Sequence, residues 1–161
     1  MSSRRAPADA LSRFDCDRFE RGVLIVARHF AAAFADPASF GWQKAYNVAA
    51  DRWGDTLGLP VAHQMSKVMR AVVACRGDSL QISPPTGRET LGVVTDDEAM
   101  LIEMLHHMRR NNARAAREVA SVLTHGTLDP EVIRAGLSFA DRFAAGAPPQ
   151  TRGRPALAVV A

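Results

Sequence analysis

The sequence predicts a mainly α fold: a compact helical domain with one small β-hairpin, winged-helix-like in layout, and a long pairing helix after the hairpin. Apolar residues recur every three or four positions through most of the chain, whereas one stretch near its middle alternates between apolar and polar residues. The chain has 161 residues, 47% of them hydrophobic, which suits one domain with its own core. We expect this domain over residues 16–146, with a flexible arm at 1–15 and a flexible tail at 147–161.

Three helices are expected before the hairpin, over residues 17–35, 40–53 and 60–76. Each has apolar residues spaced along one face, as in an amphipathic helix. Asp36-Pro37 should end the first helix and Gly54 the second, because proline disrupts a helix interior and glycine commonly ends a helix. The third begins with a proline in its first turn, which needs no backbone N–H there.

The hairpin is expected over about residues 79–95, where two strand-like runs flank a Pro-Pro-Thr-Gly turn. Thr95 and Glu98 form the pattern of a capping box, which marks the start of the next helix. That helix is predicted over about 96–124, and a last amphipathic helix opens at Asp129-Pro130.

The long helix carries residues that alternate in steps of three and four, as the seam of a coiled coil does. The predicted dimer interface consists of Leu101, Leu105, Met108, Asn112, Ala115, Val119 and Val122. Asn112 falls inside this seam, where a buried asparagine can fix the register and the number of partners at some cost in stability. Two alternatives stay open: the helix breaks at Asn111-Asn112, or the seam packs inside its own monomer.

Basic residues indicate a nucleic-acid partner. The chain has a formal net charge of +3, and all but two of its 20 basic residues are arginine, which binds phosphate and guanine through two parallel hydrogen bonds. The third helix has the position of the recognition helix of a winged helix-turn-helix, with the hairpin as its wing. The candidate DNA-binding residues here are His63, Gln64, Lys67 and Arg70, with Arg88 near the tip of the wing.

Two further basic segments fit the same partner. Arg110, Arg114 and Arg117 form a stripe at helical spacing, although a solvated surface with an Arg114–Glu118 pair is the favoured explanation of this stripe taken alone. In the tail, Arg152-Gly153-Arg154-Pro155 resembles the core of the AT-hook, a minor-groove DNA-binding motif. The resemblance implies that Arg152 and Arg154 enter the narrow minor groove of AT-rich duplex.

No set of residues indicates catalysis, and we expect no metal and no cofactor. Cys16 and Cys75 have no metal-ligand or redox spacing, and the Glu103–His106 pair is a Glu-x-x-His unit that di-iron bundles need twice. No apolar run is long enough to span a membrane, so a cytoplasmic location is expected. The sequence favours a DNA-binding regulatory protein that forms a homodimer, and the alternative is a helical protein-interaction module.

Overall fold

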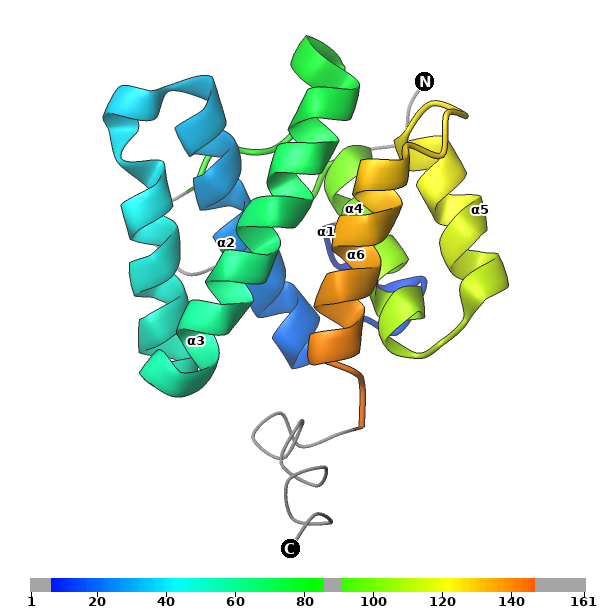
Figure 1. Cartoon of the computed structure of the whole chain (residues 1–161), viewed down its shortest axis with the longest axis horizontal. Coiled ribbons are helices and arrows are strands. Elements are labelled where there is room, and N and C mark those ends of the chain that lie inside the picture. Colours follow the sequence, from blue (N-terminus) through cyan, green and yellow to red (C-terminus); the bar gives the residue numbers. More distant parts are fainter. Residues whose placement is uncertain (1–6, 86–90, 147–161) are drawn as a thin grey trace, which may run out of the picture.

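The computed structural model describes residues 7–85 and 91–146, and its α-helices confirm the mainly helical prediction (Figure 1). The helices are α1 (Pro7–Ser12), α2 (Arg18–Ala35), α3 (Gly41–Arg76), α4 (Asp96–Arg109), α5 (Ala113–Leu123) and α6 (Pro130–Arg142). Two short 3₁₀ turns, Pro37–Ser39 and Gly77–Ser79, precede and follow α3. The core lies among the apolar faces of α2, the second half of α3, α4 and α6.

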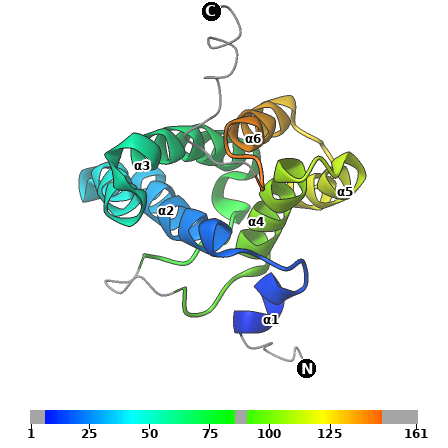
Figure 2. The same cartoon turned by 90° about the horizontal axis from the view of Figure 1, so that it is seen from below.

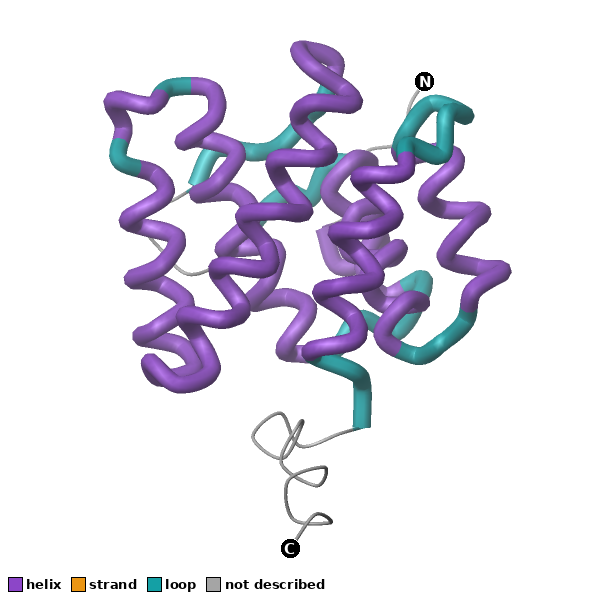
Figure 3. Tube along the Cα trace, viewed as in Figure 1, coloured by secondary structure: helices purple, strands orange, loops and turns teal. Residues whose placement is uncertain are grey.

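Helix α3 folds back on itself at Gly54, and its two halves run side by side in opposite directions (Figure 3). Gly54 has φ 77° and ψ 166°, a conformation that a residue with a side chain rarely adopts. Gly58 then lets the halves touch, because a Cβ there would lie 2.3 Å from the Ala49 carbonyl oxygen. The two predicted helices are present, but the turn between them is far shorter than expected. They form a tight αα-hairpin, which differs from the wide angle of a helix-turn-helix.

The predicted β-hairpin is wrong, since neither described range contains a β-strand. The two runs do approach each other, and Thr95 Oγ1 donates to the Gln81 carbonyl at 2.5 Å. Their backbone groups, however, bond to charged side chains. Ser83 N donates to Glu98 Oε1 at 2.8 Å, and Arg28 donates to the carbonyl of Val93 at 3.0 Å. Helices α2 and α4 therefore hold this segment in place of a strand ladder, and the winged-helix layout is wrong with it.

Two buried ion pairs explain why side chains form hydrogen bonds with the backbone of the segment between α3 and α4. Arg28 binds both carboxylate oxygens of Glu98, at 2.8 and 3.0 Å, and Arg76 binds both of Asp97, at 2.9 and 3.0 Å. Buried charges need further hydrogen bonds, and the neighbouring backbone provides them. Gln81 N, for example, donates to Asp97 at 2.7 Å. The first turn of α4 thus links α2, α3 and the segment between α3 and α4.

The prediction of one long helix is also wrong, because the helix breaks at Asn111-Asn112, as one of the two alternatives stated. Helix α4 ends at Arg109, Asn111 has a positive φ of 56°, and the Asn112 side chain accepts the Ala115 N–H at 3.3 Å. Asn112 is therefore the N-cap of α5 and no part of a buried seam. Helix α5 then turns back beside α4 and α6 (Figure 2).

The predicted dimer seam is divided by this break. Leu101, Leu105 and Met108 are buried in the protein's own core, with at most 7% of any of them exposed, so they cannot form a dimer seam. Ala115 and Val119 are half-buried on α5, and Val122 is 59% exposed. The alternative in which the seam packs within its own monomer describes the α4 part correctly.

The N-terminal residues also depart from the prediction of a flexible arm as far as residue 15. Leu11 is fully buried and Phe14 is 7% exposed, and Phe14 packs edge-on against His106. Two apolar residues three positions apart were too weak a signal to predict that α1 and the turn after it pack on the core.

None of the described helices is long and apolar enough to cross a membrane.

Candidate nucleic-acid interface

The second half of α3 and helix α6 lie side by side on one face of the protein, and α5 follows on the far side of α6 (Figures 1 and 2). The second half of α3 and α6 run in opposite directions (Figure 1). They meet where Ser138 Oγ donates to Gln64 Oε1 at 3.2 Å. Gln64 is 8% exposed and faces α6, so its predicted contact with DNA is wrong.

Three of the predicted residues do form an exposed row on this face. His63, Lys67 and Arg70 are spaced by four and three positions, and all three are exposed. Within the described ranges, no carboxylate lies within ion-pair distance of Lys67 or Arg70. A fourth cation, Arg134, lies one turn before Ser138 on α6, as Lys67 lies one turn after Gln64 on α3. Because the two helices are antiparallel, Lys67 and Arg134 stand at the same level of the face.

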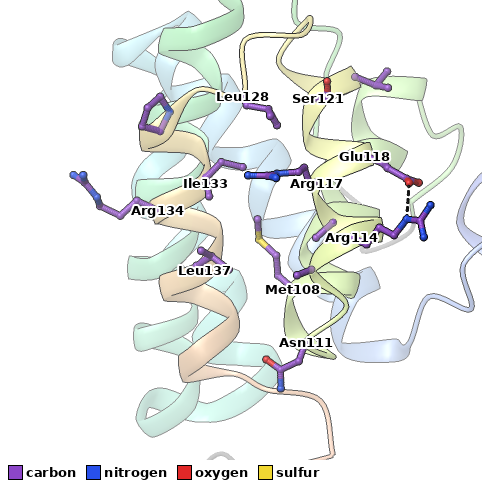
Figure 4. Close-up of a pocket in the computed structure, with 14 residues that line it drawn as sticks. Met108, Asn111, Arg114, Arg117, Glu118, Ser121, Leu128, Ile133, Arg134 and Leu137 are labelled. Carbon is purple, nitrogen blue, oxygen red and sulfur yellow. Dashed lines mark ion pairs between the residues drawn. The ribbon is translucent and has the colours of Figure 1, made fainter.

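Arg134 was not singled out from the sequence. Figure 4 shows it extending from α6 away from α5. Its guanidinium contacts Glu131 at 2.8 Å, and both side chains are mostly exposed. An exposed pair of this kind is weak, so it leaves the guanidinium available to another anion. The sequence signal was an arginine on the polar side of an amphipathic helix, and only the packing of α6 against α3 places it at the level of Lys67. We call His63, Lys67, Arg70 and Arg134 the basic face.

The predicted stripe of Arg110, Arg114 and Arg117 does not form, because the chain breaks between the first and second of these residues. Arg110 donates to Glu20 at 2.8 Å and to Asp17 at 3.0 Å. On α5, Arg114 lies 3.5 Å from Glu118, and Figure 4 shows Arg117 extending across a groove towards Ile133 of α6. The three guanidiniums thus have three different surroundings.

Arg110 belongs to a charged cluster that joins the start of α2 to the end of α4. Its centre is the Glu20 carboxylate, which is 1% exposed. His106 Nδ1 lies 2.9 Å from Glu20 Oε1, and Arg109 and Arg110 donate to Oε2. Arg109 also lies over the ring of Phe19, 4.5 Å from its centroid. His106 itself is 7% exposed and is bonded to Glu20, so it is a buried member of the cluster.

The cluster lowers the pKa of its two carboxylates. Burial alone raises the pKa of Glu20, but the hydrogen bonds from Arg110, His106 and the Asp17 amide together outweigh burial and bring it below its ordinary value. The pKa of Asp17 is lowered in the same way, by the Glu20 amide and the two arginines against the effect of burial. Both carboxylates are therefore held in their charged form.

No catalytic chemistry emerges from this cluster. Burial, and next the charge of Glu20, raises the pKa of the neighbouring Cys16 to about 12, so its thiol is a poor nucleophile at neutral pH. In the described part of the chain, no three His, Cys, Asp or Glu residues are grouped to hold a metal ion. The charges of the cluster bond to one another and support the fold.

Three predicted DNA-binding residues, Arg88, Arg152 and Arg154, lie outside the described residues. The structure adds nothing to their assignment. Comparisons with models of protein families, with curated proteins and with solved structures found no match for the chain. Function is therefore argued from the basic face itself.

Proposed function

We propose that this chain is a DNA-binding protein that contacts the phosphate backbone through the basic face of α3 and α6. One observation carries the proposal: Lys67 and Arg70 are exposed neighbours with no carboxylate within ion-pair distance in the described ranges. Three other arginines have a different role, since Arg28, Arg76 and Arg109 are bound to buried carboxylates. Exposed cations that the fold does not use suit a polyanionic partner.

The mode of binding differs from the one that the sequence suggested. A recognition helix enters the major groove when it projects from a helix-turn-helix, whereas the second half of α3 lies flat between its own first half and α6. A flat row of cations fits phosphates better than base edges. We therefore expect binding through the basic face to depend weakly on sequence.

Arg152 and Arg154 of the AT-hook-like core would add a preference for AT-rich duplex, because arginine side chains fit its narrow minor groove. In the double variant Arg152→Ala/Arg154→Ala, that preference should disappear while binding to GC-rich duplex remains.

A salt titration tests the proposal. Affinity of the full chain for AT-rich and GC-rich duplexes is measured by fluorescence anisotropy across a range of salt concentrations. Each phosphate neutralised contributes about −0.9 to the slope of log affinity against log salt, so Lys67, Arg70 and Arg134 predict a slope of about −3 on GC-rich duplex. Lys67→Ala/Arg70→Ala should make the slope shallower by about 2.

The chain offers a matched control. Arg13→Ala/Lys44→Ala removes one exposed arginine, in the turn after α1, and one exposed lysine, on the first half of α3, so the net charge changes equally outside the basic face. The control should keep the slope of the unmodified chain. Equal loss in both variants would mean that only net charge matters, and absence of binding at low salt would refute the proposal. In that case the helical protein-interaction module becomes the better interpretation, since such a module tolerates changes at Lys67 and Arg70.

The proposal does not require a homodimer. The predicted interface had its strongest residues on α4, and these are in the core. A single basic face suffices for phosphate binding, so we propose that a monomer binds.

A further inference from the structure

An apolar groove of about 1410 Å³ runs between α5 and α6 (Figure 4). Met108 lies in its floor, and Ile133, Leu137 and Leu128 point into it from the side of α6. Val122 of α5 and Leu137 of α6 are 59% and 51% exposed, so the groove is open to solvent. Exposed apolar surface that is gathered in one concave place usually marks a binding site.

The rim of the groove suits an uncharged occupant. Its one acidic lining residue, Glu118, is already paired with Arg114. Arg117 crosses the groove with its guanidinium towards α6 (Figure 4). There it can donate hydrogen bonds to the backbone carbonyls of a chain segment lying along the groove, because such carbonyls need donors once they leave water.

The chain itself contains an uncharged apolar segment close by in sequence. Residues 156–161 read Ala-Leu-Ala-Val-Val-Ala, which the DNA-binding proposal leaves unused. The described chain leaves α6 beside one end of the groove, because Ala145 N donates to the Arg109 carbonyl at 3.1 Å and Asn111 lines that end. The tail therefore starts next to the site.

The distance is within reach of the tail. Helix α5 has 11 residues and is about 16 Å long. Residues 147–155 separate the last described residue from the apolar segment, and nine residues span up to about 30 Å when extended. A tether of this length gives an effective concentration on the order of millimolar, so an intrinsic Kd below the millimolar range is enough to fill the groove.

We propose that residues 156–161 bind in the groove between α5 and α6 of the same chain. Leu157, Val159 and Val160 provide the apolar side chains, which cover Val122 and Leu137. The proposal is independent of DNA binding, and its test uses no DNA.

Methyl NMR of the full chain tests it. Spectra of the unmodified protein are compared with those of a variant that carries Leu157→Asp, Val159→Asp and Val160→Asp. The methyl resonances of Val122, Ile133 and Leu137 should shift between the two proteins, whereas those of Leu59, exposed on α3 away from the groove, should not. Adding a peptide of residues 155–161 to the variant should move the groove methyls back.

Further variants separate this occupant from others. With Leu137→Asp in the groove, the tail substitutions should no longer shift Val122 or Ile133, whereas Leu59→Asp should leave the effect intact. Shifts that grow with protein concentration, together with a doubled mass by light scattering, would mean that a second copy fills the groove and would refute binding within one chain. The proposal would also be refuted if the tail substitutions left the methyl resonances of the groove residues unshifted.

Discussion

Glu20 shows how a single side chain can hold two distant parts of the chain together. It lies in the first turn of α2, and its acceptors are filled from the end of α4 by His106, Arg109 and Arg110. Its second role is local, because it also accepts the Asp17 N–H at 3.0 Å as half of a capping box. Removing it would leave His106 Nδ1 without its partner and would leave Asp17 as the one carboxylate that Arg109 and Arg110 still contact in this cluster.

We therefore expect Glu20→Ala to lower the free energy of unfolding by about 3–5 kcal/mol, the usual effect of removing one partner from a buried ion pair. The measurement is urea unfolding followed by circular dichroism. Glu131→Ala is the control, because its pair with Arg134 is exposed and should contribute at most about 1 kcal/mol. If the two variants lost equal stability, Glu20 would have no special role.

At the scale of the element, α3 depends on the absence of a side chain at one position. Gly58 lies where a Cβ would meet backbone atoms of the other half, at 2.3 Å from the Ala49 oxygen and 2.8 Å from the Ala50 Cα. Backbone atoms in a packed helix pair have little freedom to move aside. Gly58 therefore sets how closely the two halves of α3 pack against each other.

Gly58→Ala tests this approach. Alanine normally stabilises a helix interior relative to glycine, by about 1 kcal/mol. Here we expect the opposite, a loss of about 1–3 kcal/mol from overpacking, seen as a lower midpoint of thermal unfolding. Ala74→Gly on the exposed side of the same half is the comparison, since it should show the ordinary helix propensity. A stabilised Gly58→Ala protein would contradict the close packing.

The elements also show what the sequence could predict. The Thr95–Glu98 capping box was predicted and is confirmed, because both partners lie within one turn. The hairpin was wrong because alternation is a local signal, while the groups that bind its backbone are remote: Arg28 lies 65 positions from Val93. Gln64 was misplaced for the same reason, since Ser138 lies 74 positions away. Exposure of Lys67 and Arg70 followed from the helical period alone.

For the whole molecule, the lowered pKa values predict how stability depends on pH. The ordinary pKa is 4.5 for Glu20 and 3.8 for Asp17, and both values are lower in the folded protein. Below these ordinary values the unfolded chain binds more protons than the folded one, so unfolding becomes easier as the pH falls. This contribution is complete above the ordinary values and disappears as the pH drops through the folded ones.

We expect urea midpoints to be level near neutral pH and to fall as the solution is acidified below about pH 4.5. Glu20→Gln should flatten part of that fall, because glutamine does not titrate. Glu131→Gln, on the exposed surface, should leave the curve of the unmodified protein unchanged. An acid response identical in all three proteins would place its origin in other carboxylates.

Glu20 and Arg109 are 89 positions apart in the sequence, so during synthesis Glu20 is added to the chain long before its partner. At roughly 5–20 residues per second, a ribosome adds Arg109 about 4–18 s after Glu20. Through that interval α2 exists without α4, and Arg28 also lacks Glu98. The apolar side of α2 then has no finished core to enter, so we expect the nascent N-terminal half to expose apolar surface that chaperones and proteases recognise.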